Sequence, residues 1–273
     1  MPLDAYRRAN LAQWNEAVPV HVAADAYDVA GFLAGRTTLH PREIAELGDV
    51  RGKTLLHLQC HFGMDTLSWA RRGARVTGLD FSEPALEAAR QLAAEAGLDA
   101  RFVHSELYDA PCVVAETFDI VYTGIGALNW LPDIRGWARV AADFVEPGGV
   151  LYIHEFHPIL ATLDDERTDA QLVIARPYFE QPEPLRWDDP RDYADPEARL
   201  GNTITYEWNH GLGEVATSLI DAGLAIELLH EHATCASQVL PALVHREDGW
   251  WELPEGTERL PLMYSIRARR PSS

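Results

Sequence analysis

The sequence predicts an α/β fold in which a mostly parallel sheet is doubly wound, with helices on both of its faces. Two observations support this prediction. Short apolar runs alternate with longer segments of helical length between residues 54 and 157. Capping residues, glycines or prolines mark the ends of the longer segments. Strands joined by helices of this length form right-handed βαβ units, and such units build parallel sheets.

The elements of this segment follow one another in a regular order. Strands are expected at 54–59, 74–80, 101–104, 118–123 and 150–154. Helices are expected at 64–72, 83–96 and 132–146, ended by Gly73, Gly97 and Pro147-Gly148-Gly149. A helix at 212–222 and strands at 224–230 and 262–268 then return the chain to the same sheet.

Two segments lie outside this alternation. Residues 1–50 have a helical pattern, and Pro41 stands where the first turn of a helix begins. Residues 158–205 contain six prolines and several aromatic side chains, which predicts an insertion made mostly of loops. Long inserted segments of compact domains usually act as lids or binding loops.

The composition excludes several classes of partner. The chain has 23 basic and 42 acidic residues, a net charge of −19, and Lys53 is its only lysine. Such a surface repels phosphate backbones and anionic membranes, so neither nucleic acid nor a membrane is expected as a partner. No signal peptide or membrane-spanning run is apparent, and Cys60, Cys112 and Cys235 are too few and too widely spaced for a disulfide framework. We therefore expect a cytoplasmic protein, of an oligomeric state that the sequence does not indicate.

Polar residues follow the first two strands at the edge where α/β sheets bind ligands. The first strand leads into Gln59-Cys60-His61-Phe62-Gly63, directly before a helix. Such a turn presents backbone N–H groups to a polar ligand. The second strand ends in Asp80, 17 residues after Gly63, where a carboxylate can accept hydrogen bonds from two ribose hydroxyls.

Together, residues 54–90 resemble the class I S-adenosylmethionine-dependent methyltransferases. In that family an acidic-x-Gly-x-Gly-x-Gly turn follows the first strand, and the second strand ends in Asp or Glu. Further similar stretches are Ser105-Glu106-Leu107, Phe118-Asp119-Ile120-Val121, Pro147-Gly148-Gly149, 219–224 and 263–268. The resemblance implies a Rossmann-like sheet of seven strands with an antiparallel last strand. It also implies S-adenosylmethionine as cofactor, S-adenosylhomocysteine as product, and methyl transfer to a small-molecule acceptor by direct displacement.

The resemblance also divides the chain and assigns roles to its residues. It implies an N-terminal helical lid at 1–50, a cofactor-binding core at 51–157, a substrate-covering insertion at 158–210, and the rest of the core at 211–273. Asp80 is expected to hold the ribose, Glu106 the adenine amino group, and residues 59–65 the methionine end. The full set expected around the cofactor is Trp14, Gln59, Cys60, His61, Gly63, Asp65, Asp80, Phe81, Glu106 and Leu107.

The turn after the first strand departs from the family pattern. Only Gly63 remains of the glycines, and His57 replaces the acid. We therefore expect Gln59 and His61 to adopt ordinary backbone angles or the turn to widen, with their side chains supplying hydrogen bonds. The turn lacks the Gly-x-Gly-x-x-Gly of dehydrogenases and a Walker A loop. The alternative function is a non-catalytic S-adenosylmethionine-binding protein of the same fold.

The acceptor side is expected beyond the fourth and fifth strands. His154-Glu155-Phe156-His157 lacks the spacing of a zinc helix, so no metal is predicted. A histidine suits the removal of a proton near neutral pH. His157 is the expected base or substrate orienter and His210 the reserve, although a polar strand end and a helix cap explain them as well. The expected acceptor-binding residues are Trp130, Glu155, Trp187 and Tyr193.

The acidic residues gather in the predicted insertion. Residues 161–200 contain 11 acids and 5 arginines, a net charge of −6. A negative cover attracts a cationic sulfonium or a basic acceptor, although a solvated acidic loop explains the charge equally well. We expect neutral or cationic acceptors in preference to phosphorylated ones.

Overall fold

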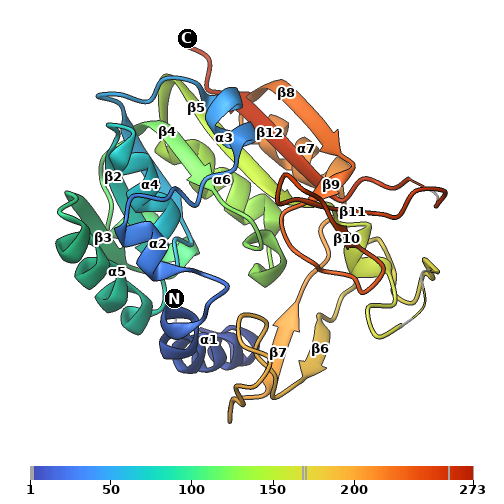
Figure 1. The fold of residues 1–273 in the computed structure, drawn as a ribbon. Helices are drawn as coiled ribbons and strands as arrows, with labels where there is room; N and C mark the ends of the chain where they lie inside the picture. Colours follow the sequence, from blue (N-terminus) through green and yellow to red (C-terminus); the bar gives the residue numbers. More distant parts are fainter. Residues whose placement is uncertain (1–2, 168, 170, 258, 273) are drawn as a thin grey trace.

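A seven-stranded sheet forms the centre of the protein (Figure 1). The computed structural model describes residues 3–167, 169, 171–257 and 259–272. The strand order is β3-β2-β1-β4-β5-β12-β8. β12 (Met263–Arg269) pairs antiparallel with β5 (Val145–Phe156) and with β8 (Ala225–His232), and the other neighbouring strands are parallel. The predicted doubly wound, Rossmann-like sheet with an antiparallel last strand is confirmed.

The remaining elements of the core lie close to their expected positions. The other strands are β1 (Thr54–Leu58), β2 (Arg75–Asp80), β3 (Ala100–His104) and β4 (Phe118–Thr123). The helices are α4 (Met64–Arg71), α5 (Glu83–Ala96), α6 (Ile134–Phe144) and α7 (Leu212–Asp221), and the 3₁₀ turns are η1 (Leu107–Cys112), η2 (Leu128–Trp130) and η3 (Leu160–Thr162). The Ser82 hydroxyl accepts the Ala85 N–H to begin α5, and Gly97 ends it in the left-handed conformation.

Each face of the sheet buries its own apolar layer. Trp137 of α6 is fully buried on one face, and Trp69 of α4 is fully buried on the other. Trp69 packs edge-on against Tyr122 of β4. Because both faces of the sheet centre are covered, the central strands β1 and β4 are buried almost throughout, as expected for a parallel sheet.

Two boundaries differ from the expectation. β5 begins at Val145, not at residue 150, and α6 ends at Phe144. Val145 already pairs with Phe118, and an irregularity in the register absorbs the residues that follow. The segment after β8 contains three short strands that were not predicted, β9 (Thr234–Cys235), β10 (Val244–His245) and β11 (Trp251–Glu252).

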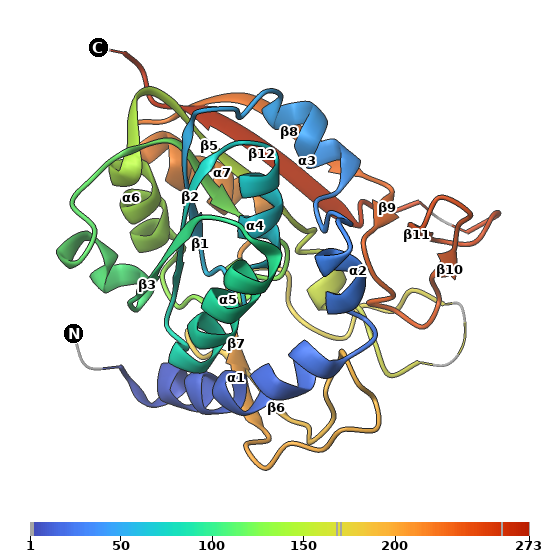
Figure 2. The same cartoon turned by 60° about the vertical axis from the view of Figure 1, so that its left-hand side comes forward.

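The N-terminal segment and the insertion meet at one end of the sheet. The first contains α1 (Ala5–Ala23), α2 (Val29–Leu33) and α3 (Pro41–Leu47), and the second contains β6 (Leu185–Asp188) and β7 (Ile204–Glu207). Both views place α1 beside β7 (Figures 1 and 2). Asn10, which is 1% exposed, donates to the Tyr206 carbonyl and accepts the Tyr206 N–H, each at 2.8 Å. Through these two hydrogen bonds the side-chain amide of Asn10 joins α1 to β7, with the pairing that a neighbouring strand would make.

No helix in the described part of the chain is long and apolar enough to cross a membrane.

Candidate active site

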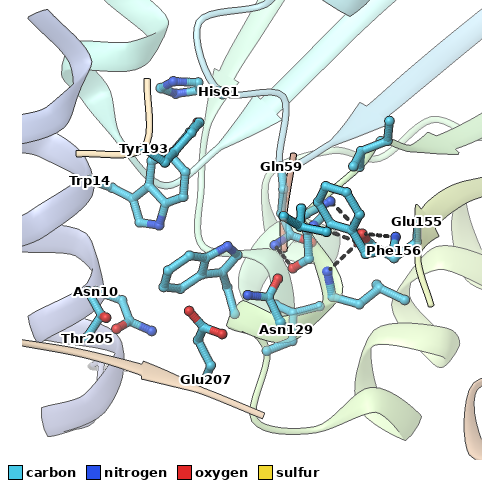
Figure 3. A pocket seen from close by; sticks show the side chains of 18 of the residues that line it. Asn10, Trp14, Gln59, His61, Asn129, Glu155, Phe156, Tyr193, Thr205 and Glu207 are labelled. Carbon is cyan, nitrogen blue, oxygen red and sulfur yellow. Dashed lines mark hydrogen bonds between the residues drawn. The ribbon is translucent and has the colours of Figure 1, made fainter. Parts of the chain in front are cut away.

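A cavity of about 2120 Å³ lies between the sheet and the segments that meet α1 (Figure 3). Its floor is formed by residues that follow β1, β2, β3, β4 and β5. β1 and β4 are neighbours at the point where the strand order reverses, which is where ligands bind in open α/β sheets. The cavity is lined by all the predicted site residues: Trp14, Gln59, Cys60, His61, Gly63, Asp65, Asp80, Phe81, Glu106, Leu107, Trp130, Glu155, His157, Trp187, Tyr193 and His210.

The turn after β1 keeps a glycine-like backbone without the glycines. Gln59 has a φ of 57° and His61 a φ of 51°, so the expectation of ordinary angles at these positions is wrong. A left-handed conformation costs an L-residue about 1–2 kcal/mol. Hydrogen bonds offset this cost: Gln59 Nε2 donates to the Ala127 carbonyl at 2.9 Å, and the His61 N–H donates to Asp80 at 2.8 Å. Gly63 remains because a Cβ there would lie 2.9 Å from the Phe102 ring.

Gln59 also leaves a buried acceptor in the wall of the cavity. Since its Nε2 is held by Ala127, its Oε1 faces the other way, and it has no hydrogen-bond partner among the described residues. A buried carbonyl oxygen without a donor costs about 1–3 kcal/mol, so such an atom calls for a ligand that donates. The ammonium group of S-adenosylmethionine is a donor of this kind, and the residues present fit that cofactor.

Asp80 at the end of β2 is a buried carboxylate with remaining acceptor capacity. Its Oδ2 accepts the His61 N–H at 2.8 Å and its Oδ1 accepts the Ser82 N–H at 2.9 Å. Burial raises the pKa of Asp80 to about 6, against the lowering effect of these backbone donors. Asp80 is therefore ionised at pH 7, and each of its oxygens has a lone pair left for a ribose hydroxyl.

Glu106 connects the end of β3 to the N-terminal helix. Its Oε1 accepts from Arg7 Nη1 of α1 at 2.9 Å, and its Oε2 accepts the Tyr108 N–H at 2.7 Å. The neighbouring apolar lining of the cavity comes from Phe81 and Leu107. Glu106 thus holds the first turns of α1 over the region expected to receive adenine.

Two other residues of the turn region are held by local contacts. The Thr38 hydroxyl donates to Asp65, and burial raises the pKa of Asp65 to about 6. Cys60 Sγ lies 3.6 Å from the His61 carbonyl oxygen, and burial raises the pKa of this thiol well above its usual range. Cys60 therefore stays a neutral thiol, and only its backbone is suited to contact a ligand.

Glu155 has a different task from the one expected. Its Oε1 accepts the N–H groups of Gly126 at 2.6 Å and Phe156 at 2.7 Å. Its Oε2 accepts those of Ala127 at 2.7 Å and Leu128 at 3.1 Å. The expectation that this carboxylate binds the acceptor is corrected: with four backbone donors it shapes the loop after β4.

His157 does not offer a free lone pair. Its Nδ1 accepts the Ile159 N–H at 3.1 Å, so its proton resides on Nε2. Nε2 lies 3.0 Å from the Glu231 carboxylate, although the alignment is not that of a hydrogen bond. To accept a proton, His157 would first have to release Ile159, so this arrangement does not suit a base. Its expected role as a substrate orienter stays a prediction.

His210 is committed in the same way. Its Nε2 donates to the Leu131 carbonyl at 2.8 Å, and its Nδ1 lies 2.8 Å from Glu180. Glu180, His210 and Glu214 also form a group with the spacing of metal ligands among the described residues. Because one ring nitrogen of His210 lies against the Leu131 carbonyl and the other against Glu180, neither is free to act as the reserve base.

Aromatic side chains from α1, from η2 and from the insertion also line the cavity. Trp14 meets Trp130 edge to face at 5.3 Å between ring centroids. Trp187 has a buried Nε1 without a partner among the described residues, and the Arg176 guanidinium lies 4.6 Å from its ring centroid. Tyr193 is 69% exposed and therefore lies at the rim of the cavity.

Glu207 and Asn129 were not singled out from the sequence. Figure 3 shows both side chains pointing into the same part of the cavity. Glu207 is half-buried, and burial raises the pKa of its carboxyl. The period of two along β7 places Thr205 and Glu207 on one face of the strand, and this was the signal available in the sequence.

Comparisons with known proteins find similarity to methyltransferases. The family described as "Methyltransferase domain" matches residues 55–149. The ubiquinone biosynthesis O-methyltransferase of Cronobacter sakazakii is 28% identical over 185 residues, covering 66% of this chain and 73% of that protein. The protein of the same name from Salmonella arizonae is 30% identical over 135 residues, covering 48% of this chain and 55% of that protein.

Solved structures share the fold. An S-adenosylmethionine-dependent methyltransferase from Mesorhizobium loti has a TM-score of 0.60 at 23% identity, covering 87% of this chain and 100% of that one. The glycopeptide N-methyltransferase MtfA, complexed with S-adenosylmethionine, has a TM-score of 0.55 at 16% identity, covering 84% and 92%. The family match, the relatives and the fold agree: the chain carries a methyltransferase domain at residues 55–149 and is similar to methyltransferases that use S-adenosylmethionine.

Proposed function

We propose that the enzyme methylates a hydroxyl oxygen on a small, planar acceptor that is neutral or cationic. The observation that carries this proposal is the lining of the cavity, where Trp14, Trp130 and Trp187 occur together with polar residues that follow the strands. Flat aromatic side chains suit a planar ring, and a half-buried carboxylate at Glu207 disfavours an anion. The name of the two relatives, an O-methyltransferase, supports oxygen as the acceptor atom.

Three side chains would hold the cofactor, which supplies a methyl group on a positively charged sulfur. Asp80 would accept from the ribose hydroxyls and Glu106 from the adenine amino group. Gln59 Oε1 would accept from the ammonium group. All three are acceptors that are buried or half-buried in the wall of the cavity, which makes their hydrogen bonds to charged or polar donors strong.

The rest of the chain would position the reactants and exclude water. Direct displacement needs the attacking atom and the leaving sulfur in line, and little covalent chemistry falls to the protein. Glu155 orients the loop that carries Asn129 and Trp130, so it acts as a positioning residue. The N-terminal segment 1–50 would serve as a lid and the insertion 158–210 as the substrate cover, joined to each other through Asn10.

The test is a turnover assay preceded by a binding assay. Calorimetry with S-adenosylhomocysteine first establishes cofactor binding. Release of S-adenosylhomocysteine from S-adenosylmethionine is then measured with catechols and phenols, matched anilines and thiophenols, and the phosphorylated phenols. We expect turnover with the hydroxyl compounds and none with the phosphates. Turnover confined to the anilines or thiophenols would refute oxygen as the acceptor atom, and equal turnover of the phosphates would refute the charge argument.

A further inference from the structure

Three side chains from distant parts of the sequence form a continuous hydrogen-bonded chain. Asp192 Oδ2 of the insertion lies 2.9 Å from Nε2 of His21 in α1. Nδ1 of His21 lies 2.9 Å from Nε2 of His61 in the turn after β1. The side chains of His21 and Asp192 are 1% and 0% exposed, so these two members of the hydrogen-bonded series are closed to water, whereas His61 lines the cavity.

The positions of the protons follow from the ends of this chain. Asp192 acts as an acceptor, because its Oδ1 already accepts the Ala194 N–H at 2.8 Å. Nε2 of His21 must then donate to Asp192, and the neutral ring accepts at Nδ1. That bond requires His61 to donate from Nε2. The remaining nitrogen of His61, Nδ1, therefore carries a lone pair, and the carboxylate at the far end polarises it.

The surroundings of His61 contain few other titratable groups. Tyr27 and Tyr193, which hydrogen bond to each other, lie against His21 from the segment after α1 and from the insertion. Asp80 of β2 accepts the backbone N–H of His61. The ring of Trp14 lies edge-on to His61 at 5.2 Å. Asp192 is thus the carboxylate that is linked through hydrogen bonds to the His61 ring.

We propose that Asp192, His21 and His61 form a proton relay whose cavity end, Nδ1 of His61, accepts the proton that the acceptor hydroxyl loses on methylation. This inference rests on the proposed O-methyl transfer. In the reaction, the acceptor oxygen bonds to the methyl carbon as the carbon–sulfur bond breaks, with the electron pair left on sulfur. The hydroxyl proton passes to His61 and from there to water once the site opens.

Both histidine rings are uncharged before the reaction and can therefore accept a proton. Burial lowers the pKa of His21, and burial together with the neighbouring His21 lowers the pKa of His61 to about 3, so both rings are neutral at pH 7. A hydroxyl is a far weaker acid than protonated His61 before reaction. The same oxygen, once bonded to the methyl carbon, is a far stronger acid than protonated His61. The proton therefore moves downhill during bond formation, which is when a base is useful.

The same distances would be found if the three residues served only to hold the insertion, α1 and the turn together, which we call a structural staple. The two roles are separated by a spectroscopic readout and a kinetic one. Nitrogen-15 spectra of the histidine rings in the full chain, loaded with S-adenosylhomocysteine, report which nitrogen carries each proton. We expect His21 and His61 both protonated on Nε2 at pH 7, with Nδ1 of His61 bare. A His61 ring protonated on Nδ1 at pH 7 would overturn the relay.

The kinetic readout uses the best hydroxyl acceptor from the turnover assay. His61→Gln is expected to lower kcat by about 100-fold and Asp192→Asn by about 10-fold, at the low end of what a positioned base contributes. The kcat of both variants is measured at saturating cofactor, and the dissociation constant of S-adenosylhomocysteine should change by less than about 3-fold in Asp192→Asn, since Asp192 lies outside the residues expected around the cofactor. His230→Gln removes an exposed histidine of β8 and serves as the control. A staple would instead raise the dissociation constant and leave kcat of the saturated enzyme unchanged, which would overturn the proposal.

Failure of the relay and failure of O-methylation give different results. If no hydroxyl compound is turned over, the spectra still decide whether Nδ1 of His61 is the bare nitrogen. If hydroxyl compounds are turned over and His61→Gln keeps the parent kcat, the relay is refuted and the O-methylation stands.

Discussion

Replacing Gln59 by glycine restores a residue that the family has in this turn, and we predict that it weakens cofactor binding. The family glycine provides a left-handed backbone and no side chain. In this protein Gln59 has the same backbone angle and adds Oε1, a buried acceptor without a partner. If Oε1 receives the ammonium group of the cofactor, the restored glycine loses one charge-assisted hydrogen bond.

The expected size follows from that bond. A hydrogen bond to a charged group contributes about 1.5–3 kcal/mol, which corresponds to a dissociation constant raised about 10- to 150-fold. Stability should change little. The variant loses the bond from Nε2 to the Ala127 carbonyl, about 0.5–1.5 kcal/mol, and relieves left-handed strain of about 1–2 kcal/mol.

Calorimetry with S-adenosylhomocysteine measures the effect without turnover. Asp28→Gly is the matched control, because it relieves the same kind of left-handed strain at a residue that does not line the cavity. We expect its dissociation constant to change by less than about 3-fold. S-adenosylhomocysteine lacking its α-amino group should bind the parent and Gln59→Gly equally. If Gln59→Gly binds the complete ligand as tightly as the parent, or binds both ligands equally worse, the assignment of Oε1 to the ammonium group is refuted.

Three further predictions concern the walls of the cavity. Glu155→Gln should lower the free energy of unfolding by about 2 kcal/mol, because an amide NH₂ would face backbone donors. Urea unfolding measures this loss, with Glu207→Gln as a control whose free energy of unfolding should stay within about 0.5 kcal/mol of the parent. Equal losses in the two variants would contradict the prediction. The affinity for S-adenosylhomocysteine should fall as pH is lowered through about 6, because Asp80 has a raised pKa and its protonated form accepts fewer hydrogen bonds. Asp80→Asn should bind the ligand weakly at every pH, without this decline. A parent affinity that does not change with pH would refute the assignment of Asp80 to the ribose hydroxyls. Asn10→Leu should speed hydrogen exchange in α1 and weaken ligand binding, because the backbone groups of Tyr206 lose their partner; unchanged exchange would show that α1 is held by other contacts.

The sheet could be predicted because its determinants are local. Buried strands appear as apolar runs, and signals such as Ser82 and Gly97 lie beside the helix that they bound. The start of β5 was missed because Pro147-Gly148-Gly149 has the composition of a turn. In the structure only glycine fits at position 149, because a Cβ there would lie 2.9 Å from the carbonyl oxygen of Asp119 on the neighbouring strand. Composition does not encode that approach between strands.

The set of residues around the cavity was predictable, and their contacts were not. Topology brings the carboxyl ends of parallel strands together, so residues that follow strands meet at one edge. Which of them stay free depends on partners far away in the sequence. Glu155 is occupied by a loop that precedes it by 27 to 29 residues. His210 is held by Leu131, 79 residues away, and no local pattern distinguishes it from a free histidine.

The absence of two family glycines from the turn therefore indicates that the cofactor site is coupled to the acceptor side, and does not indicate that cofactor binding has been lost. A turn that had lost its ligand would be expected to relax to ordinary backbone angles, since nothing would maintain the left-handed strain at Gln59 and His61. Both angles persist, and each side chain is tied to a different wall of the cavity: Gln59 to the loop after β4, and His61 through His21 to the insertion. The side chains of Gln59 and His61, which stand where the family has glycine, thus connect the cofactor turn to the segments that would hold the acceptor. Cofactor binding and closure of the insertion should then depend on each other, because any shift of this turn moves both walls.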